Sequence, residues 1–201
     1  MPYCDAWCKS SADKHYHDTE WGRPLRDDRA LFEFLILEVM QCGLSWQLIL
    51  KKRAIMRHCF DNFDFTRIAR YTQRDITRIL NTPGMIKSPR KIKAVIQNAN
   101  AFLKVRQAFG SFSAFLWAYS LNKTIIYSGH CLGKVPVSNG LSARISRELK
   151  TRGFTFLGPV TVYSYLQSCG IINDHSAACP LFKHINNNHP NIKMPRDSEV
   201  F

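Results

Sequence analysis

A single carboxylate, Glu38, interrupts a segment that otherwise has the pattern of a helix packed against a core. Apolar or nearly apolar side chains recur in residues 30–46 with the spacing of one buried helix face. This face carries Leu31, Phe34, Leu35 and Cys42. Glu38 falls on the same face, where an unpaired carboxylate costs several kcal/mol. No Lys or Arg lies within one turn on either side, so either a bound ligand pairs with Glu38 or buried backbone and Tyr donors satisfy it.

Two Cys and His pairs, one near each end of the sequence, offer the ligands of a metal site. His175 and Cys179 are four residues apart, which places both on one side of a helical turn, and Cys4 and His17 provide a second pair. Two thiolates and two imidazoles are a closed tetrahedral set typical of structural zinc. About 160 residues separate the pairs, and the entropic cost of closing such a loop grows only slowly with its length. The competing N-terminal ligands are Cys8 and His15.

The charge of the chain points to a polyanionic partner. The 201 residues include 28 Lys and Arg against 15 Asp and Glu, a formal net charge of +13. Nucleic acid is the first candidate and an anionic membrane surface the second. No apolar run approaches the roughly 20 residues of a membrane span, and the N-terminus lacks the layout of a signal peptide. We therefore expect a cytoplasmic protein whose seven scattered Cys residues are core thiols or metal ligands.

The elements that must position these residues are predicted to be mostly α-helical. We expect a helical region over 28–60 that breaks near Gly43 and is capped by Asp27 or Asp28. The other predicted helices cover 64–81 as two short helices, 89–105 after a turn, 111–120 and 138–152. A last long helix lies within 158–174, with Pro159 near its start and Gly170 near its end. Only KTIIYS (123–128) has a strand pattern. We predict one helical domain over residues 1–182, closed by the metal site, and a disordered tail over 183–201.

Four segments, in this order, resemble the 3-methyladenine DNA glycosylase I family. They are YHDTEWG (16–22), LFEFLILEVMQCGLSWQLILKKR (31–53), RKIKAVIQNA (90–99) and RGFTFLGPVTVYSYLQSCGIINDH (152–175). The match is collinear from about Cys4 to Cys179. The resemblance implies a fold of the helix-hairpin-helix glycosylase superfamily and hydrolysis of the N-glycosidic bond of 3-methyladenine in double-stranded alkylated DNA, with the free base as product.

The same resemblance assigns roles to individual residues. It places one structural zinc ion on Cys4, His17, His175 and Cys179. It places the extruded base against Tyr16, Trp21, Glu38 and Trp46. Aromatic rings suit this task because stacking stabilises a flipped base by about 1–3 kcal/mol. Methylation at N3 makes adenine cationic, so the π faces and the Glu38 carboxylate both attract it. Glu38 is then the catalytic and selecting group, while water attacks the sugar carbon of a base that already leaves readily.

Residues 83–93 form the predicted DNA-binding hairpin, a tight turn followed by closely spaced cations. Its cations are Lys87, Arg90, Lys91 and Lys93. Backbone N–H groups at a turn and helix start, together with cations, bind phosphates without reading the base sequence. This stretch departs from the family, where a polar residue and an Arg commonly precede a small residue. Here Pro89 follows Ser88 and removes one N–H donor.

Gly43 and Leu44 lie where the family wedges into the duplex beside the extruded nucleotide. The alternative is that Leu44 does not enter the duplex and is an ordinary core residue. No Asp occurs between Lys91 and Asn173, and no Lys is marked as a Schiff-base nucleophile, which favours a monofunctional glycosylase without lyase activity.

Two other function classes remain as alternatives, and we expect a monomer in each case. One is a non-catalytic, zinc-stabilised helical DNA-binding protein that has kept the scaffold. The other is a zinc hydrolase acting on another nucleic acid, which would need an open coordination position.

Overall fold

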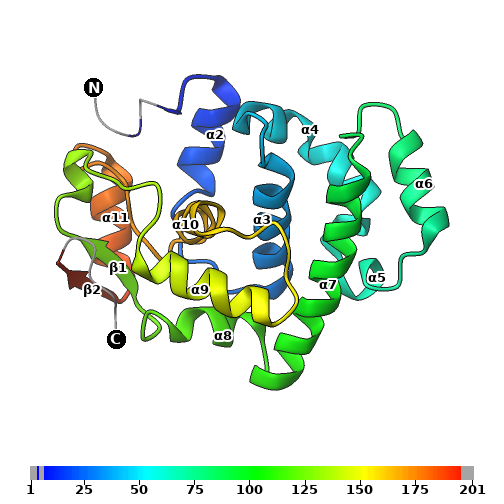
Figure 1. Cartoon of the computed structure of the whole chain (residues 1–201). Coiled ribbons are helices and arrows are strands. Elements are labelled where there is room, and N and C mark those ends of the chain that lie inside the picture. Colours follow the sequence, from blue (N-terminus) through cyan, green and yellow to red (C-terminus); the bar gives the residue numbers. More distant parts are fainter. Residues whose placement is uncertain (1–3, 5–6, 196–201) are drawn as a thin grey trace. The chain divides into compact units, whose positions relative to one another are not determined.

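The computed structural model describes Cys4 and residues 7–195, which form two compact units (Figure 1). Unit 1 contains the described residues up to Leu25, Leu116–Ser146 and those from Gly158 onward. Unit 2 contains Arg26–Phe115 and Arg147–Leu157. Each unit is assembled from separated stretches of chain, so local sequence patterns did not mark the division. None of the described helices has the length and hydropathy needed to cross a membrane.

Unit 2 is helical and carries the segment around Glu38. Its elements are α3 (Asp28–Gln41), α4 (Trp46–Cys59), η1 (Asp61–Phe63), α5 (Phe65–Ile68), α6 (Gln73–Asn81) and α7 (Pro89–Phe109). The Asp27 side chain caps α3 by accepting from the Ala30 N–H, one of the two predicted caps. The predicted break near Gly43 is confirmed, since α3 ends at Gln41 and α4 begins at Trp46.

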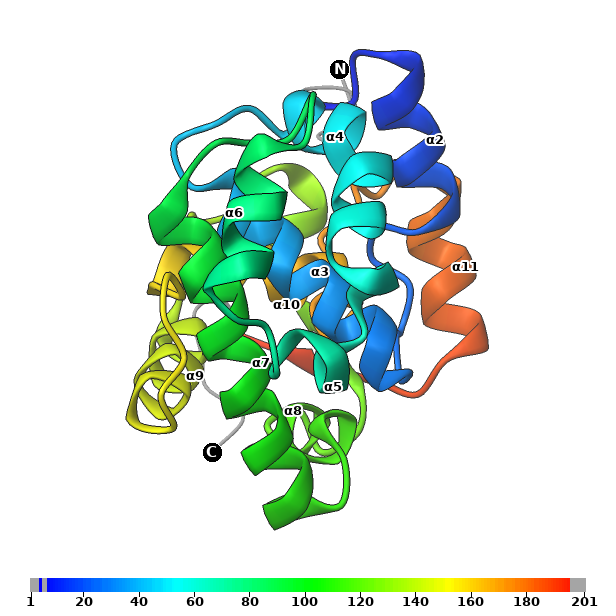
Figure 2. The same cartoon turned by 90° about the vertical axis from the view of Figure 1, so that its right-hand side faces the viewer.

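Helices α3 and α7 pack side by side in the core of unit 2 (Figures 1 and 2). The Phe102 ring of α7 lies 5.1 Å from the Phe32 ring of α3 and 4.2 Å from the Phe112 ring, measured between ring centroids. Asp28, the first residue of α3, joins that helix to α7 and to the start of the next helix, because its carboxylate accepts from the Phe112 N–H and from Arg106 Nε. The helix that carries Glu38 is therefore held by aromatic packing at Phe32 and by an ion pair at its start.

Unit 1 combines helices with a small parallel sheet. Its elements are α2 (Ser11–Thr19), β1 (Thr124–Tyr127), η2 (His130–Leu132), α10 (Pro159–Ser168), α11 (Pro180–Asn188) and β2 (Asn191–Met194). Two further helices, α8 (Phe112–Ala118) and α9 (Gly140–Thr151), contribute residues to both units. The predicted strand over KTIIYS is confirmed as β1, which pairs with β2 from Thr124↔Asn191 to Tyr127↔Met194.

The C-terminal region confirms one prediction and corrects another. The helix expected to begin near Pro159 and end near Gly170 is α10, which ends at Ser168, and α11 follows it. Residues 183–194 are not disordered: they form most of α11 and all of β2, while 196–201 lie outside the described residues. The stabilising contacts are long-range, namely the pairing of β2 with β1 and a hydrogen bond from Asn173 Nδ2 to Asn186 Oδ1. Neither contact can be inferred from the local pattern of an Asn-rich sequence.

Candidate functional site

Unit 1 brings Cys4, His17, His175 and Cys179 together in one buried cluster. One potential ligand atom from each residue lies within 4.8 Å of all the others. His17 comes from α2, and Cys179 is the N-cap of α11. The alternative residues Cys8 and His15 are not part of this cluster. The cluster could therefore hold a metal ion that joins the two ends of the described chain.

The distances within the cluster fit a tetrahedral ion. Cys4 Sγ and Cys179 Sγ each lie 3.7 Å from His175 Nδ1, and Cys179 Sγ lies 3.7 Å from His17 Nε2. A tetrahedral ion with bonds of about 2.0–2.3 Å places its ligand atoms about 3.3–3.8 Å apart. Three of the spacings between the potential ligand atoms therefore match those of a tetrahedral metal site.

The surroundings of the cluster set the chemical state of its members. The Nδ1 atom of His17 lies 2.7 Å from Asp18 Oδ1, so the carboxylate can accept the Nδ1 proton and leave Nε2 as the ligand atom. Burial lowers the pKa of His175 to about 3, which keeps its imidazole in the neutral, ligating form. Burial also raises the pKa of the Cys4 thiol to about 11. Metal binding at neutral pH must therefore displace the proton of this thiol.

One predicted base-binding residue, Trp21, packs directly against the cluster, and a second, Tyr16, is connected to it through Trp7. The Trp21 ring lies 4.6 Å from the His175 ring, nearly perpendicular to it, and 5.9 Å from the His17 ring. Tyr16 is buried, and the Trp7 ring lies 5.1 Å from Trp21 and 6.5 Å from Tyr16. The aromatic rings and the four potential ligands therefore form one continuous packed group within unit 1.

From the sequence we assigned no role to Asp18 or Trp7. Asp18 directly follows a potential metal ligand, and carboxylates that orient ligating imidazoles are common, so its adjacency to His17 was a usable signal. Trp7 precedes the first segment that resembles the glycosylase family, and only its contacts in the fold reveal its association with Tyr16 and Trp21.

In unit 2, Glu38 lies on the buried face of α3, as its position in the helical pattern predicts. The residue is only 5% exposed, and burial raises the pKa of its carboxyl group to about 8. In the described part of the chain, no Lys, Arg or His pairs with this carboxylate, and no hydrogen bond satisfies it. These facts disfavour the purely structural explanation, in which backbone or Tyr donors bind Glu38.

The four predicted base-binding residues divide between the units. Tyr16 and Trp21 belong to unit 1, whereas Glu38 and Trp46 belong to unit 2. Trp46 is half-buried at the first turn of α4, where the Ser45 side chain caps the helix by accepting from the Leu48 N–H. The fold thus places Tyr16 and Trp21 in the unit that holds the Cys and His cluster. Glu38 and Trp46 lie on α3 and α4 of unit 2.

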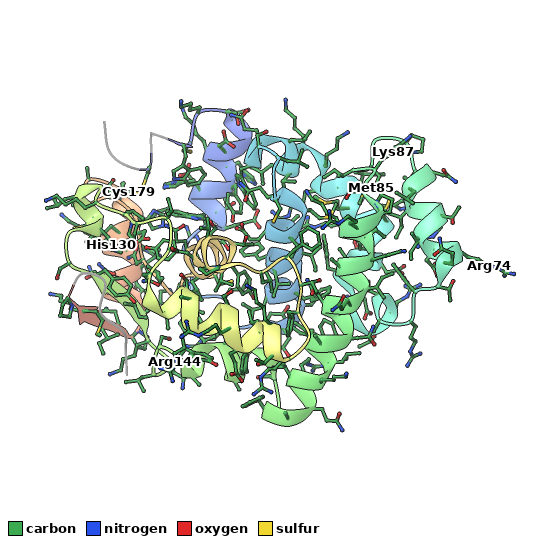
Figure 3. The ribbon with its side chains drawn as sticks, viewed as in Figure 1. Arg74, Met85, Lys87, His130, Arg144 and Cys179 are labelled. Carbon is green, nitrogen blue, oxygen red and sulfur yellow. The ribbon has the colours of Figure 1, made fainter. Side chains whose placement is uncertain are left out.

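The predicted DNA-binding hairpin connects α6 to α7. Figure 3 shows Met85 and Lys87 in this connection, with the Lys87 side chain at the surface. Ser88 is the N-cap of α7 and Pro89 is its first residue, where a missing N–H removes no intrahelical bond. The departure from the family pattern therefore forms a regular helix start. Arg90 and Lys93 are exposed, as phosphate-contacting cations must be.

Lys91 was also predicted to contact DNA phosphates, but its side chain is buried. Its side chain is 8% exposed, and Nζ donates to the carbonyl oxygens of Met40 at 2.6 Å and Cys42 at 2.7 Å. We therefore remove Lys91 from the predicted phosphate contacts. The sequence could not show this, because the spacing of charges in a basic helix does not reveal which cation faces the carbonyl groups of another segment.

Gly43 and Leu44, the predicted wedge, form the turn between α3 and α4. Gly43 is exposed and has φ +76°, a conformation that favours glycine. Leu44 is half-buried, and its N–H donates to the Gln41 carbonyl at 2.6 Å. Leu44 is therefore not an ordinary, fully buried core residue.

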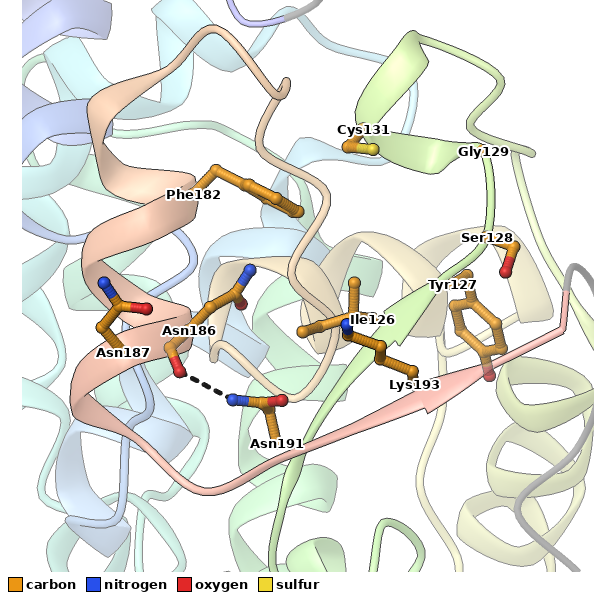
Figure 4. A pocket seen from close by; sticks show the side chains of 10 residues that line it. All are labelled: Ile126, Tyr127, Ser128, Gly129, Cys131, Phe182, Asn186, Asn187, Asn191 and Lys193. Atoms are coloured by element: carbon orange, nitrogen blue, oxygen red, sulfur yellow. Dashed lines mark hydrogen bonds between the residues drawn. The ribbon is translucent and has the colours of Figure 1, made fainter.

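Unit 1 also contains a cavity of about 500 Å³ that none of the predicted site residues lines (Figure 4). Its walls come from β1 and the segment after it, α11 and β2. The lining residues are Ile126, Tyr127, Ser128, Gly129, Cys131, Phe182, Asn186, Asn187, Asn191 and Lys193. The Asn191 side chain donates to the Asn186 carbonyl across this wall. The cavity depends on residues 183–194, so a sequence reading that left them disordered could not anticipate it.

Comparison with known proteins decides the family. A family model described as methyladenine glycosylase matches residues 7–184. The chain belongs to this family. DNA-3-methyladenine glycosylase 1 of Escherichia coli (strain K12) is 40% identical over 164 residues, which cover 82% of this chain and 88% of that protein. A methyladenine glycosylase of Haemophilus influenzae, named DNA-3-methyladenine glycosylase, is 40% identical over 165 residues, 82% of this chain and 89% of its own.

Solved structures of methyladenine glycosylases have the same fold. A tyrosine-to-phenylalanine variant of 3-methyladenine DNA glycosylase I in complex with 3-methyladenine has a TM-score of 0.84 and 37% identity, covering 90% of this chain and 97% of its own. A glutamate-to-glutamine variant of the Staphylococcus aureus enzyme has the same TM-score, identity and coverage. The predicted membership of the 3-methyladenine DNA glycosylase I family is therefore confirmed.

Proposed function

We propose that this chain is a monofunctional DNA glycosylase that hydrolyses the N-glycosidic bond of 3-methyladenine in alkylated double-stranded DNA. The observation that carries the proposal is the buried carboxylate of Glu38, which has no counter-charge among the described residues of a methyladenine glycosylase. The product is the free base, and we propose that the protein acts as a cytoplasmic monomer.

Glu38 selects the damaged base by charge. Burial favours the neutral carboxyl group, but a cationic base beside it stabilises the carboxylate and lowers its pKa again. Ordinary adenine is neutral and offers no such stabilisation. Because N3-methylated adenine is already a good leaving group, a modest catalyst suffices: the site holds the base while water attacks the sugar carbon.

Tyr16, Trp21 and Trp46 supply the aromatic surfaces of the proposed base site. Stacking on each ring stabilises the flipped base by about 1–3 kcal/mol, which offsets the cost of leaving the duplex. Among the related structures, a tyrosine-to-phenylalanine variant was solved in complex with 3-methyladenine, so a methyladenine glycosylase of this fold binds the free base.

We propose that Cys4, His17, His175 and Cys179 hold one structural zinc ion. The donor set of two thiols and two imidazoles and the 3.7 Å spacings fit this metal. With four protein ligands, the ion would supply folding energy and no water activation. The protein groups around it would then hold Trp21 and, through Trp7, Tyr16 in place.

DNA binding is proposed to use the hairpin and the turn between α3 and α4. Backbone N–H groups at the start of α7 and the exposed cations Lys87, Arg90 and Lys93 would contact phosphates. Gly43 and Leu44 would enter the stack vacated by the flipped nucleotide. These contacts position the duplex and leave the choice of base to the aromatic site.

Chromatography of bases released from methylated duplex DNA tests the proposal. We expect release of 3-methyladenine but not of 7-methylguanine. The Glu38→Gln variant should release 3-methyladenine about 10²-fold more slowly and bind the free base more weakly. Wild-type values for both quantities would contradict the role of Glu38. DNA binding without release of any base by the wild type would favour the alternative of a non-catalytic DNA-binding protein.

A further inference from the structure

Lys91 connects the helix that follows the DNA-binding hairpin to the end of the helix that carries Glu38. It is the third residue of α7, and its Nζ reaches the Met40 carbonyl at 2.6 Å and the Cys42 carbonyl at 2.7 Å. Both distances are short for N–H···O hydrogen bonds, as expected when the donor is charged. All of these residues lie in unit 2, where α3 and α7 pack together.

The chemistry of this contact suits a lysine. The last carbonyl groups of a helix lack intrahelical partners and carry the negative end of the helix dipole. An ammonium group offers three donors and the complementary charge. In the described ranges, Lys91 forms no ion pair with a carboxylate, and its ammonium group donates to the two carbonyl groups instead. The Lys91 side chain is largely removed from water, and this burial lowers its pKa.

The segment that Lys91 contacts leads directly into the predicted wedge. Cys42 precedes Gly43, and a Cβ atom at Gly43 would meet no atom within 4 Å. The turn is therefore held at its base and open at its tip. The Cys42 thiol also donates to the Glu38 carbonyl at 3.7 Å, so the backbone at Glu38 and the start of the turn belong to one hydrogen-bonded group.

We propose that Lys91 is a positioning residue, which fixes the Glu38 end of α3 and the base of the 42–45 turn to the hairpin helix α7. DNA held by the hairpin and the wedge residue Leu44 then share one rigid frame, so that phosphate contacts place Leu44 at the correct base step. This inference rests on the proposed function. It predicts that loss of the ammonium group impairs base extrusion more than DNA binding.

The test compares Lys91→Met, which keeps the side-chain length but not the donors, with Lys104→Met. Lys104 is an exposed lysine on the same helix α7 and serves as the matched control. Hydrogen–deuterium exchange of peptides covering residues 41–46 measures the anchoring without DNA. We expect exchange about tenfold faster in Lys91→Met and unchanged exchange in Lys104→Met. Lys91→Arg, which keeps charge and donors, should restore most of the protection.

Two measurements with DNA separate positioning from mere stability. Duplexes with 2-aminopurine beside the lesion report base unstacking by fluorescence, and single-turnover base release at saturating protein reports the chemical step. For Lys91→Met we expect base unstacking and the single-turnover rate of base release each to fall about tenfold or more. The Kd for undamaged duplex should change less than about threefold. A purely structural role would lower the melting temperature and leave these rates per folded molecule unchanged.

Several outcomes would overturn the inference. Unchanged exchange over 41–46 would show that Lys91 does not anchor the turn. Faster exchange with wild-type unstacking and release would show that the anchor does not position Leu44. A Kd increase as large as that of Lys87→Met would make Lys91 a phosphate contact. If Lys91→Met does not fold, Lys91→Gln is measured in the same way. If the wild type releases no base, the proposed function fails, while exchange and unstacking still decide the role of Lys91.

Discussion

The Nδ1 atom of His175 lies 3.7 Å from the Sγ atom of Cys4, although the two residues are 171 positions apart. A contact of this span closes almost the whole described chain into one loop. Without a further bond between them, two such groups gain little from their proximity, because burial raises the pKa of the thiol and keeps the imidazole neutral. The proposed metal ion would give this arrangement a stabilising role, which leads to the first prediction.

Removal of the metal should unfold unit 1 more readily. Cys179→Ser should abolish binding of one equivalent of zinc and lower the melting temperature by roughly 10 °C, as the loss of about 3–5 kcal/mol would in a protein of this size. Cys8→Ser is the control, since Cys8 lies outside the cluster, and it should keep the metal. Metal content is measured by elemental analysis and stability by calorimetry. Equal zinc content in the two variants would contradict the assignment.

Glu38 should make stability fall as pH rises. Its folded-state pKa of about 8 lies above the usual 4.5, so between these values the native state binds more protons than the unfolded state. The stability linked to protonated Glu38 is fully present below pH 4.5 and is lost as the pH rises through 8. The total loss is at most about 5 kcal/mol. Urea unfolding of wild type and Glu38→Gln across this range measures it. The difference between the two proteins should shift in favour of the variant as pH rises, and a constant difference would contradict the raised pKa.

The exposed hairpin cations should set the salt dependence of DNA binding. Lys87→Ala and Arg90→Ala should each weaken binding to any duplex sequence and reduce the slope of log K against log salt by about 1. Lys91→Ala should not reduce this slope, because its ammonium group is committed to carbonyl oxygens. Fluorescence anisotropy titrations at several salt concentrations provide the measurement. Equal slopes for wild type and Lys87→Ala would remove Lys87 from the interface.

Gly170→Ala should destabilise the protein by about 3 kcal/mol or more. Gly170 has φ +72°, and a Cβ there would lie 2.4 Å from the Arg23 carbonyl carbon, a backbone atom that cannot move aside easily. The control is Gly153→Ala, where φ is +92° but no atom lies within 4 Å, so only backbone strain of about 1 kcal/mol is expected. Denaturant unfolding compares the two, and similar losses would exclude the steric explanation.

The local features of the fold follow from the sequence, and the long-range ones do not. Caps such as Asp27 and Asp64, and the break at Gly43, depend on neighbours within a few residues, and periodicity reveals them. The parallel pairing of β1 with β2 depends on residues far apart in the chain. Asparagine-rich segments gain order only through such partners, which is why α11 and β2 escaped prediction.

The site shows the same limit. Glu38 was conspicuous because a carboxylate violated an apolar pattern, and the structure places it where that pattern indicated. Lys91 was misjudged because it follows the pattern of a basic helix start, and its use is visible only once the Met40 and Cys42 carbonyl groups are in place. The four Cys and His residues could be listed from the sequence, but their convergence needed the fold.

The composition of unit 1 has a consequence for biosynthesis. Its strand β1 pairs with β2, and the set of four potential ligands is complete only when Cys179 is present. Most of unit 2, by contrast, is contiguous from Arg26 to Phe115. As the chain leaves the ribosome, the α3–α7 core can therefore assemble early, whereas the aromatic and ligand cluster cannot be complete until Cys179 has been synthesised. Nascent chains stalled before residue 179 should then carry a folded helical core and no bound metal.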